Sequence, residues 1–172
     1  MTQYKPFQDS LPDGHNGEDR VFLALSAHGA QVQRYDCRGA FDLTATIHFG
    51  HPERIEVKNE DNYATSGNVC LELWQGKEAP RPSGIAVSES TVCVHTLGSV
   101  MAIYRTQSMR LFIKSNDGTW PLRGFGDNGN RGLVIPRSDL LGRWWFDVVD
   151  DEHLATSPVF LSGDGSADER LR

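Results

Sequence analysis

Residues 41–58 read FDLTATIHFGHPERIEVK, the stretch with the clearest structural pattern in the chain. Apolar residues occupy every second position of 41–49, which predicts a strand with one buried face. Residues 50–53 read as a turn, and residues 55–58 alternate apolar and charged side chains in a second short strand. The two segments therefore predict an antiparallel hairpin.

Further elements are expected on both sides of this hairpin. Asn16 can cap a helix that begins near Gly17 and ends near Gly29, and Thr106 can cap a second helix. The helix that Thr106 caps is expected at 107–114. The other expected elements are strands at 68–74, 91–97 and 99–105, a possible short helix within 84–90 and an edge strand at 133–135. This order of elements indicates an α/β (α+β) fold with a mixed central β-sheet flanked by helices.

The chain of 172 residues fits one domain, because single globular cores usually occupy about 100 to 200 residues. We expect an N-terminal arm at 1–15 and the folded domain at 16–160. Residues 161–172 consist mostly of glycine, serine and charged side chains, and are expected to form a flexible tail.

The charge is unevenly distributed along the chain. The net charge of −6 argues against a protein that coats nucleic acid through bulk charge alone. Residues 101–146, however, carry seven basic and three acidic side chains. Within this stretch Lys114, Arg123 and Arg131 are candidates to contact a nucleic-acid backbone, although evenly spaced surface arginines often serve only solvation.

Membrane insertion and a disulfide framework are not expected. No apolar run approaches the roughly 20 residues that span a bilayer, and the first residues lack the apolar stretch of a signal peptide, so a soluble cytoplasmic protein is expected. Cys37, Cys70 and Cys93 form no CxxC pair and leave one thiol over. They are expected to be small buried residues.

The polar face of the predicted hairpin carries the chemistry. Glu56 and Lys58 are two apart on one strand and project to the same side, and a hairpin can place Asp42 across from Glu56. Two carboxylates with a phosphate oxygen and waters suffice to hold Mg²⁺, for which Mn²⁺ can substitute, and the carbonyl of Val57 is a further possible ligand.

Two more side chains can assist such a site. Lys58 can orient the attacking water and neutralise charge in the transition state of phosphodiester hydrolysis. Glu18 lies on the predicted first helix, from which its carboxylate can join the metal directly or through water. A simpler reason for Glu18 is its favourable interaction with the positive end of its own helix.

The order of Glu18, Asp42 and then Glu56-Val57-Lys58 resembles the PD-(D/E)xK nuclease superfamily over residues 16–140. Within it, the chain is similar to small phage and bacterial endonuclease-like or resolvase-like proteins. In these the ExK strand precedes Thr/Ser-Gly-Asn, an apolar run and Glu, and the matching residues here are Ser66-Gly67-Asn68-Val69-Cys70-Leu71-Glu72, followed later by Ser83-Gly84-Ile85.

The resemblance implies a restriction-endonuclease-like fold, a DNA substrate, a bacterial or phage-infected cell and a possible homodimer. It also implies that Asp42 and Glu56 are metal ligands, that Lys58 is the catalytic lysine and that Glu18 is an accessory acid. Phe41 departs from the pattern, because the family usually has proline before the aspartate.

Other interpretations remain open. Asp42, Glu56 and Lys58 can form a plain cross-strand ion pair on a solvent face. The protein can also be a catalytically inactive relative that keeps the fold and binds nucleic acid or a protein partner. His48 and His51 flank a turn and can contribute to a zinc site only if further ligands converge on them.

Overall fold

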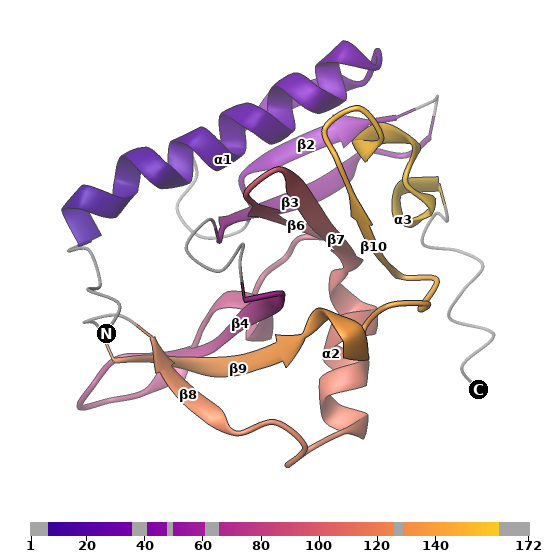
Figure 1. Ribbon diagram of the computed structural model, residues 1–172. Helices are drawn as coiled ribbons and strands as arrows, with labels where there is room; N and C mark the ends of the chain where they lie inside the picture. The colour runs from indigo at the N-terminus through magenta and orange to yellow at the C-terminus, as the bar shows by residue number, and fades with distance from the viewer. Residues whose placement is uncertain (1–6, 36–40, 48–49, 61–65, 126–128, 162–172) are drawn as a thin grey trace.

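The computed structural model describes residues 7–35, 41–47, 50–60, 66–125 and 129–161. They form an α+β fold with two β-sheets, as Figure 1 shows. This confirms the expected fold class, with a mixed central sheet and flanking helices. No helix of the described part of the chain is both long and apolar enough to cross a membrane.

The larger sheet has six strands in the order β1-β2-β3-β6-β7-β10. The strands β3 and β6 are parallel, and all other neighbours in this sheet are antiparallel. The predicted hairpin is confirmed, because Leu43 pairs with Ile55 in antiparallel register. The strand bounds are β1 Gln31–Arg34, β2 Leu43–Thr46, β3 Glu53–Asn59, β6 Val92–Leu97, β7 Val100–Arg105 and β10 Phe146–Val149.

Helix α1, Phe7–Ala27, covers one face of the larger sheet. Val21 and Leu25 are fully buried there and share a core with Ile55 and Val57. The helix begins well before Gly17, so the expected start near Gly17 with Asn16 as its cap was wrong, and α1 takes up residues 7–15 of the expected arm. Apart from Leu161, the expected tail lies outside the described residues.

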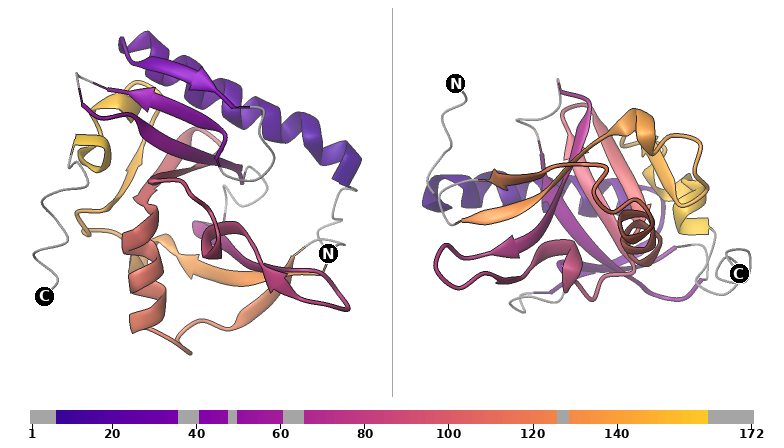
Figure 2. Two further views of the ribbon diagram at one scale, coloured as in Figure 1. Left: turned by 180° about the vertical axis from the view of Figure 1, so that it is seen from behind. Right: turned by 90° about the horizontal axis from the view of Figure 1, so that it is seen from below.

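The opposite face of the larger sheet packs against a second sheet and helix α2, Thr106–Ser115, as the views in Figure 2 show. The second sheet has the order β5-β4-β9-β8, and its strands are all antiparallel. The bounds are β4 Asn68–Gln75, β5 Arg81–Pro82, β8 Leu122–Phe125 and β9 Asn130–Pro136. Short helices complete the fold: η2 Gly84–Ala86, η3 Arg137–Asp139, η4 Leu154–Thr156 and α3 Pro158–Leu161.

This second sheet was not predicted. The segment 68–74 was expected in the central sheet, but it forms β4 of the separate sheet because Val69 and Leu71 face the core around α2. The segment 133–135 belongs to β9, which lies between β4 and β8 rather than at an edge. Local alternation predicts that a strand forms, but not which sheet it joins.

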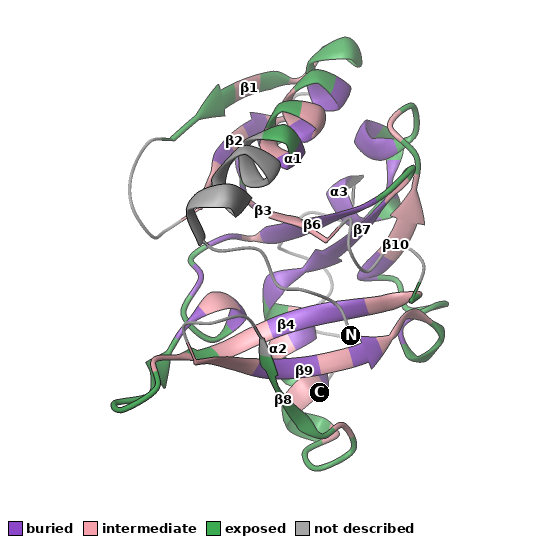
Figure 3. Cartoon of the chain, turned by 60° about the vertical axis from the view of Figure 1, so that its left-hand side comes forward, coloured by how far each residue is buried: buried purple, intermediate pink, exposed green. Residues whose placement is uncertain are grey.

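Helix α2, Thr106–Ser115, agrees closely with the expected 107–114. The expected cap does not form, because Arg105 is the N-cap and no side-chain cap bond is made. The Thr106 hydroxyl instead contacts Ser90 Oγ at 3.0 Å and Cys93 Sγ at 3.5 Å. Figure 3 shows that buried residues are concentrated in β6 and β7 and in parts of β4 and β9, whereas β1 is largely exposed.

Candidate functional site

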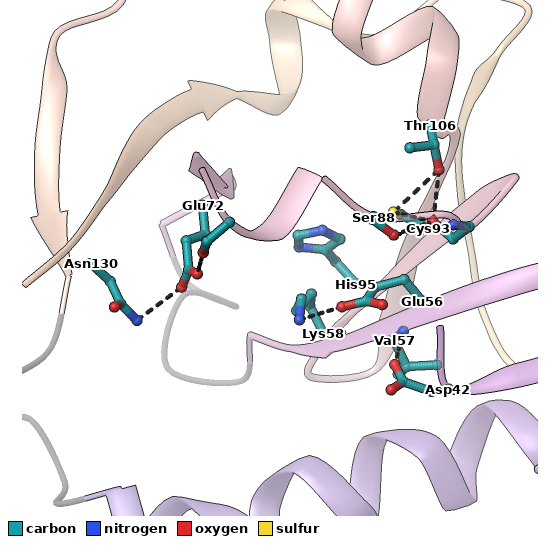
Figure 4. A network of polar contacts seen from close by, with 12 residues as sticks. Asp42, Glu56, Val57, Lys58, Glu72, Ser88, Cys93, His95, Thr106 and Asn130 are labelled. Atoms are coloured by element: carbon teal, nitrogen blue, oxygen red, sulfur yellow. Dashed lines mark hydrogen bonds and ion pairs between the residues drawn. The ribbon is translucent and has the colours of Figure 1, made fainter. Parts of the chain in front are cut away.

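Strand β3 directs its apolar and charged side chains to opposite faces of the larger sheet. Ile55 and Val57 belong to the core under α1. Glu56 and Lys58 are at the alternate positions and therefore face the second sheet. The spatial pairing of Glu56 with Lys58 that the sequence predicts is thus present, and Figure 4 shows both side chains on this strand.

Asp42 lies just before β2 and is fixed against β3. Its Oδ2 accepts a hydrogen bond from the backbone N–H of Val57 at 2.7 Å, and its own N–H donates to the carbonyl of Ile55 at 2.9 Å. Continuing the register by one residue from Leu43–Ile55 places Asp42 beside Glu56. The hairpin therefore brings these two carboxylates together, as the sequence predicts.

The Asp42 carboxyl has an unusual proton affinity. Burial raises its pKa, and the negative charge of Glu56 raises it further, to about 6. The Val57 hydrogen bond and the charge of Lys58 act in the opposite direction without cancelling the rise. Glu18 also raises this pKa through its charge, so α1 places Glu18 within electrostatic reach of Asp42.

Gly17 lets α1 approach the sheet closely at this point. A Cβ atom at Gly17 would lie 3.2 Å from Cβ of Asn59, 3.4 Å from Oγ1 of Thr96 and 3.6 Å from Cγ1 of Val57. The absent side chain thus allows the helix to rest on β3 and β6. Because Glu18 is the next residue, the same contact determines where its carboxylate lies.

Lys58 forms an ion pair with Glu56. Its Nζ lies 2.5 Å from Glu56 Oε1, and the lysine side chain is 43% exposed. Burial opposes the ammonium charge, but Glu56 and Asp42 together raise the pKa of Lys58 above its ordinary value. Lys58 is therefore charged throughout the neutral pH range.

The donor set fits Mg²⁺. In a strand, the N–H and C=O of one residue point to the same edge, so the Val57 carbonyl lies along the edge that faces Asp42. No three His, Cys, Asp or Glu side chains of the described residues converge as a closed metal cage. Magnesium does not need such a cage, because it commonly binds one or two carboxylates, keeps several waters and takes the rest from phosphate. The mutual repulsion of Asp42 and Glu56 is what a divalent cation would relieve.

A buried polar network lies beside these residues on β6 and β7. His95 pairs in register with Lys58, and Cys93 with Glu56. The His95 side chain is almost fully buried, and its Nε2 lies 2.8 Å from the Tyr104 hydroxyl. Its Nδ1 lies 3.5 Å from Glu60 Oε1. Sequence reasoning missed His95. The signal was present, because Cys93 and His95 alternate with Val92 and Val94 along the predicted strand.

Glu60 links this network to the second sheet. Burial together with the charge and hydrogen bond of Glu60 raises the pKa of the Cys70 thiol. Glu60 follows Lys58 at the next position on the same face, and Cys70 lies on β4. Cys70 on β4 therefore lies close to Glu60, which directly follows the strand of Glu56 and Lys58.

Glu72 lies on the same face of β4 as Cys70 and is held by two partners. Its Oε1 accepts a hydrogen bond from the Ser83 hydroxyl, and its Oε2 accepts from Asn130 Nδ2 at 2.9 Å. Gly84 has a φ of +53°, and a Cβ there would lie 2.5 Å from the carbonyl oxygen of Glu72. The two sequence motifs at 66–72 and 83–85 thus converge on the Glu72 carboxylate.

The three candidate nucleic-acid contacts do not share one face. Arg123 pairs in register with Gly132, and Arg131 pairs with Gly124, so Arg123 and Arg131 point to opposite sides of the second sheet. Gly132 also pairs with Glu72, so Arg123 lies on the face that carries Glu72. Lys114 is exposed in the last turn of α2.

Other basic side chains of residues 101–146 have structural partners. Arg105 is buried and its Nη1 lies 2.8 Å from Glu53 Oε1. Arg110 donates to the backbone carbonyls of Ile85 and Ser88, at 2.7 Å and 2.5 Å. Part of the positive charge of residues 101–146 therefore lies on side chains that bind other groups of the protein itself.

Two sequence-based expectations concern histidines and thiols. Cys70 and Cys93 are buried, as expected. His51 is exposed. His48 and Cys37 lie outside the described residues, so the proposed zinc ligation by His48 and His51 stays a prediction.

Comparison with known proteins gives one similar structure. No family model and no curated protein sequence matches the chain. A bacterial homing endonuclease, I-Ssp6803I, is similar in structure, with 14% sequence identity and a TM-score of 0.46. The similarity covers 72% of this chain and 76% of that chain.

Proposed function

We propose that this protein is a Mg²⁺-dependent DNA endonuclease of the PD-(D/E)xK type, in which Asp42 and Glu56 hold the metal and Lys58 is the catalytic lysine. The observation that carries this proposal is the convergence of Asp42, Glu56 and Lys58 at one strand edge. A plain surface ion pair would not explain why Asp42 is buried enough for its pKa to rise to about 6.

Each protein group has a distinct task in this proposal. Asp42 and Glu56 would bind the metal, and the Val57 carbonyl would be a third ligand. When bound, Mg²⁺ would neutralise phosphate charge and lower the pKa of a coordinated water. Lys58 lies beside these two carboxylates. From there its ammonium can orient the attacking water and stabilise the extra negative charge of the transition state. Glu18 is the accessory acid, and its negative charge acts on Asp42.

Hydrolysis then proceeds without a covalent enzyme intermediate. The attacking water gives up a proton to the solvent as its oxygen forms a bond to phosphorus. The bond from phosphorus to one deoxyribose oxygen breaks, and that oxygen takes a proton from a second water as it leaves. Arg123 is the proposed contact for the DNA backbone on the face of the site. Lys114 and Arg131 would contact DNA only if it extends around the second sheet. A homodimer would place two such sites on the two strands.

The test is cleavage of labelled single-stranded, duplex and branched DNA in Mg²⁺ or Mn²⁺. Wild-type protein, Glu56→Ala and Lys58→Ala are compared, with Glu78→Gln as a matched surface control because Glu78 is exposed. We expect metal-dependent cutting that both site variants lose and the control keeps. Absence of cutting, or equal cutting by all proteins, would favour the catalytically inactive relative that binds nucleic acid or a protein partner.

A further inference from the structure

The proposed reaction leaves Glu72 without a role, although several residues hold it in place. Ser83 and Asn130 occupy both of its carboxylate oxygens with one hydrogen bond each. The backbone at Gly84 passes so close to Glu72 that only glycine fits. A carboxylate that two separate segments hold through hydrogen bonds is oriented in a defined direction.

The location of Glu72 restricts what that contact can be. Glu72 and Cys70 share one face of β4, and Cys70 meets Glu60 from the strand of Glu56 and Lys58. Glu72 is only partly buried. Figure 4 shows the Glu72 carboxylate directed toward Asn130.

The neighbours of Glu72 point to a polyanionic ligand with hydrogen-bond donors. Arg123 lies on the same face two strands away, with only Gly132 between them in register. Strands are about 4.8 Å apart, so a backbone phosphate at Arg123 leaves room for a base near Glu72. The Oδ1 atom of Asn130 is shielded from solvent and has no hydrogen-bond partner among the described residues, so a second acceptor lies beside the carboxylate.

We propose that Glu72, oriented by Ser83 and Asn130, accepts a hydrogen bond from the exocyclic amino group of a base in the DNA substrate. This inference rests on the proposed function for the identity of the ligand. Carboxylates recognise base amino groups such as N4 of cytosine, and phosphate contacts alone carry no sequence information. The site therefore prefers cytosine or adenine over thymine at one position near the scissile phosphate.

A metal ion is the less suitable occupant of this position. No group of three His, Cys, Asp or Glu side chains of the described chain gathers around Glu72. Arg123 on the same face adds positive charge, which favours DNA and disfavours a cation.

The experiment replaces single bases of a labelled oligonucleotide by purine or pyrimidin-2-one, which lack the exocyclic amino group of adenine or cytosine. Binding is measured in Ca²⁺ and cleavage in Mg²⁺, for wild type, Glu72→Gln and the control Glu78→Gln. We expect about a tenfold loss of wild-type binding or cleavage at one position. Glu72→Gln should lose this discrimination, whereas Glu78→Gln should keep it.

Asn130→Ala and Ser83→Ala are made beside Glu72→Gln, and thermal melting identifies any variant that does not fold. Both should weaken the same discrimination, because they release the carboxylate. Cleavage without any effect of the analogues, or discrimination that Glu72→Gln retains, overturns the inference and leaves the proposed nuclease intact. Amino-dependent binding without cleavage supports the inference and contradicts the nuclease. No binding to any DNA contradicts both.

Discussion

Asp42 Oδ2 accepts a hydrogen bond from the backbone N–H of Val57 at 2.7 Å, so one metal-binding candidate is attached to the strand that carries the other. This bond crosses the hairpin just where β2 begins. It holds the Asp42 carboxylate in a partly buried position near the negative charge of Glu56, at an energetic cost to the folded protein.

The first prediction concerns that cost and its dependence on pH. The folded pKa of Asp42 is about 6, above its ordinary value of 3.8. Between these values the folded protein binds more protons than the unfolded chain, so stability falls as pH rises from about 4 to about 6. We expect metal-free Asp42→Asn to be more stable than wild type at pH 7.5, by about 2 kcal/mol, and to lose this advantage at pH 4.

Thermal melting in EDTA at both pH values measures this difference. Asp139→Asn is the matched control, because Asp139 is exposed on the 3-10 helix η3. A lower melting temperature of Asp42→Asn at pH 7.5 would contradict the electrostatic account. Added Mg²⁺ should raise the melting temperature of wild type but not of Asp42→Asn.

The second prediction concerns the close approach of α1 at Gly17. A valine there would place three carbon atoms where Asn59, Thr96 and Val57 leave no room. We expect Gly17→Val to destabilise the fold by about 1–3 kcal/mol in denaturant unfolding. Ala27→Val, at an exposed position of the same helix, should change stability by less than about 1 kcal/mol. Equal effects of the two variants would mean that α1 does not rest on the sheet at Gly17.

The third prediction concerns the buried ion pair of Glu53 and Arg105. Both side chains are nearly enclosed, and Thr91 Oγ1 also donates to Glu53 Oε2 at 2.5 Å. Glu53→Gln should cost about 3 kcal/mol of unfolding free energy, because it leaves Arg105 charged without its carboxylate. The double variant Glu53→Gln/Arg105→Met should recover part of this loss. Additive losses in the double-mutant cycle would show that the pair is not coupled.

The fourth prediction concerns DNA affinity and salt. Arg123 shares its face with Glu72, whereas Arg131 points to the other side. Arg123→Ala should weaken binding by several-fold and reduce the slope of log affinity against log salt by about one. Anisotropy titrations across salt concentrations measure this slope, with Arg131→Ala as the comparison. A larger slope change for Arg131→Ala would place DNA on the opposite face of the second sheet.

Much of the candidate site was predictable from local pattern. The alternation within 41–49 and 55–58 sets the face of each side chain, and a short turn leaves the hairpin little choice of partner. These two facts bring Asp42, Glu56 and Lys58 together. The strand pair at 91–105 was predictable for the same reason, because only Gly98 and one further residue separate β6 from β7.

The parts that were missed depend on contacts between distant segments. Alternation in 68–74 predicts a strand, but its assignment to a second sheet depends on pairing with β9, more than fifty residues later. His95 enters the site only through the parallel pairing of β3 with β6. The separation of Arg123 from Arg131 follows from strand register, which charge counting along the sequence cannot reveal.

The most direct measurement of the central claim is the single-turnover rate of DNA cleavage as a function of Mg²⁺ concentration, for wild type and Lys58→Met. The account predicts no cleavage in EDTA, a wild-type rate that rises and saturates with Mg²⁺, and a rate at least about a hundredfold lower for Lys58→Met. It also predicts that Mg²⁺ still raises the melting temperature of Lys58→Met. Cleavage in EDTA, or an unchanged rate in Lys58→Met, would contradict the account.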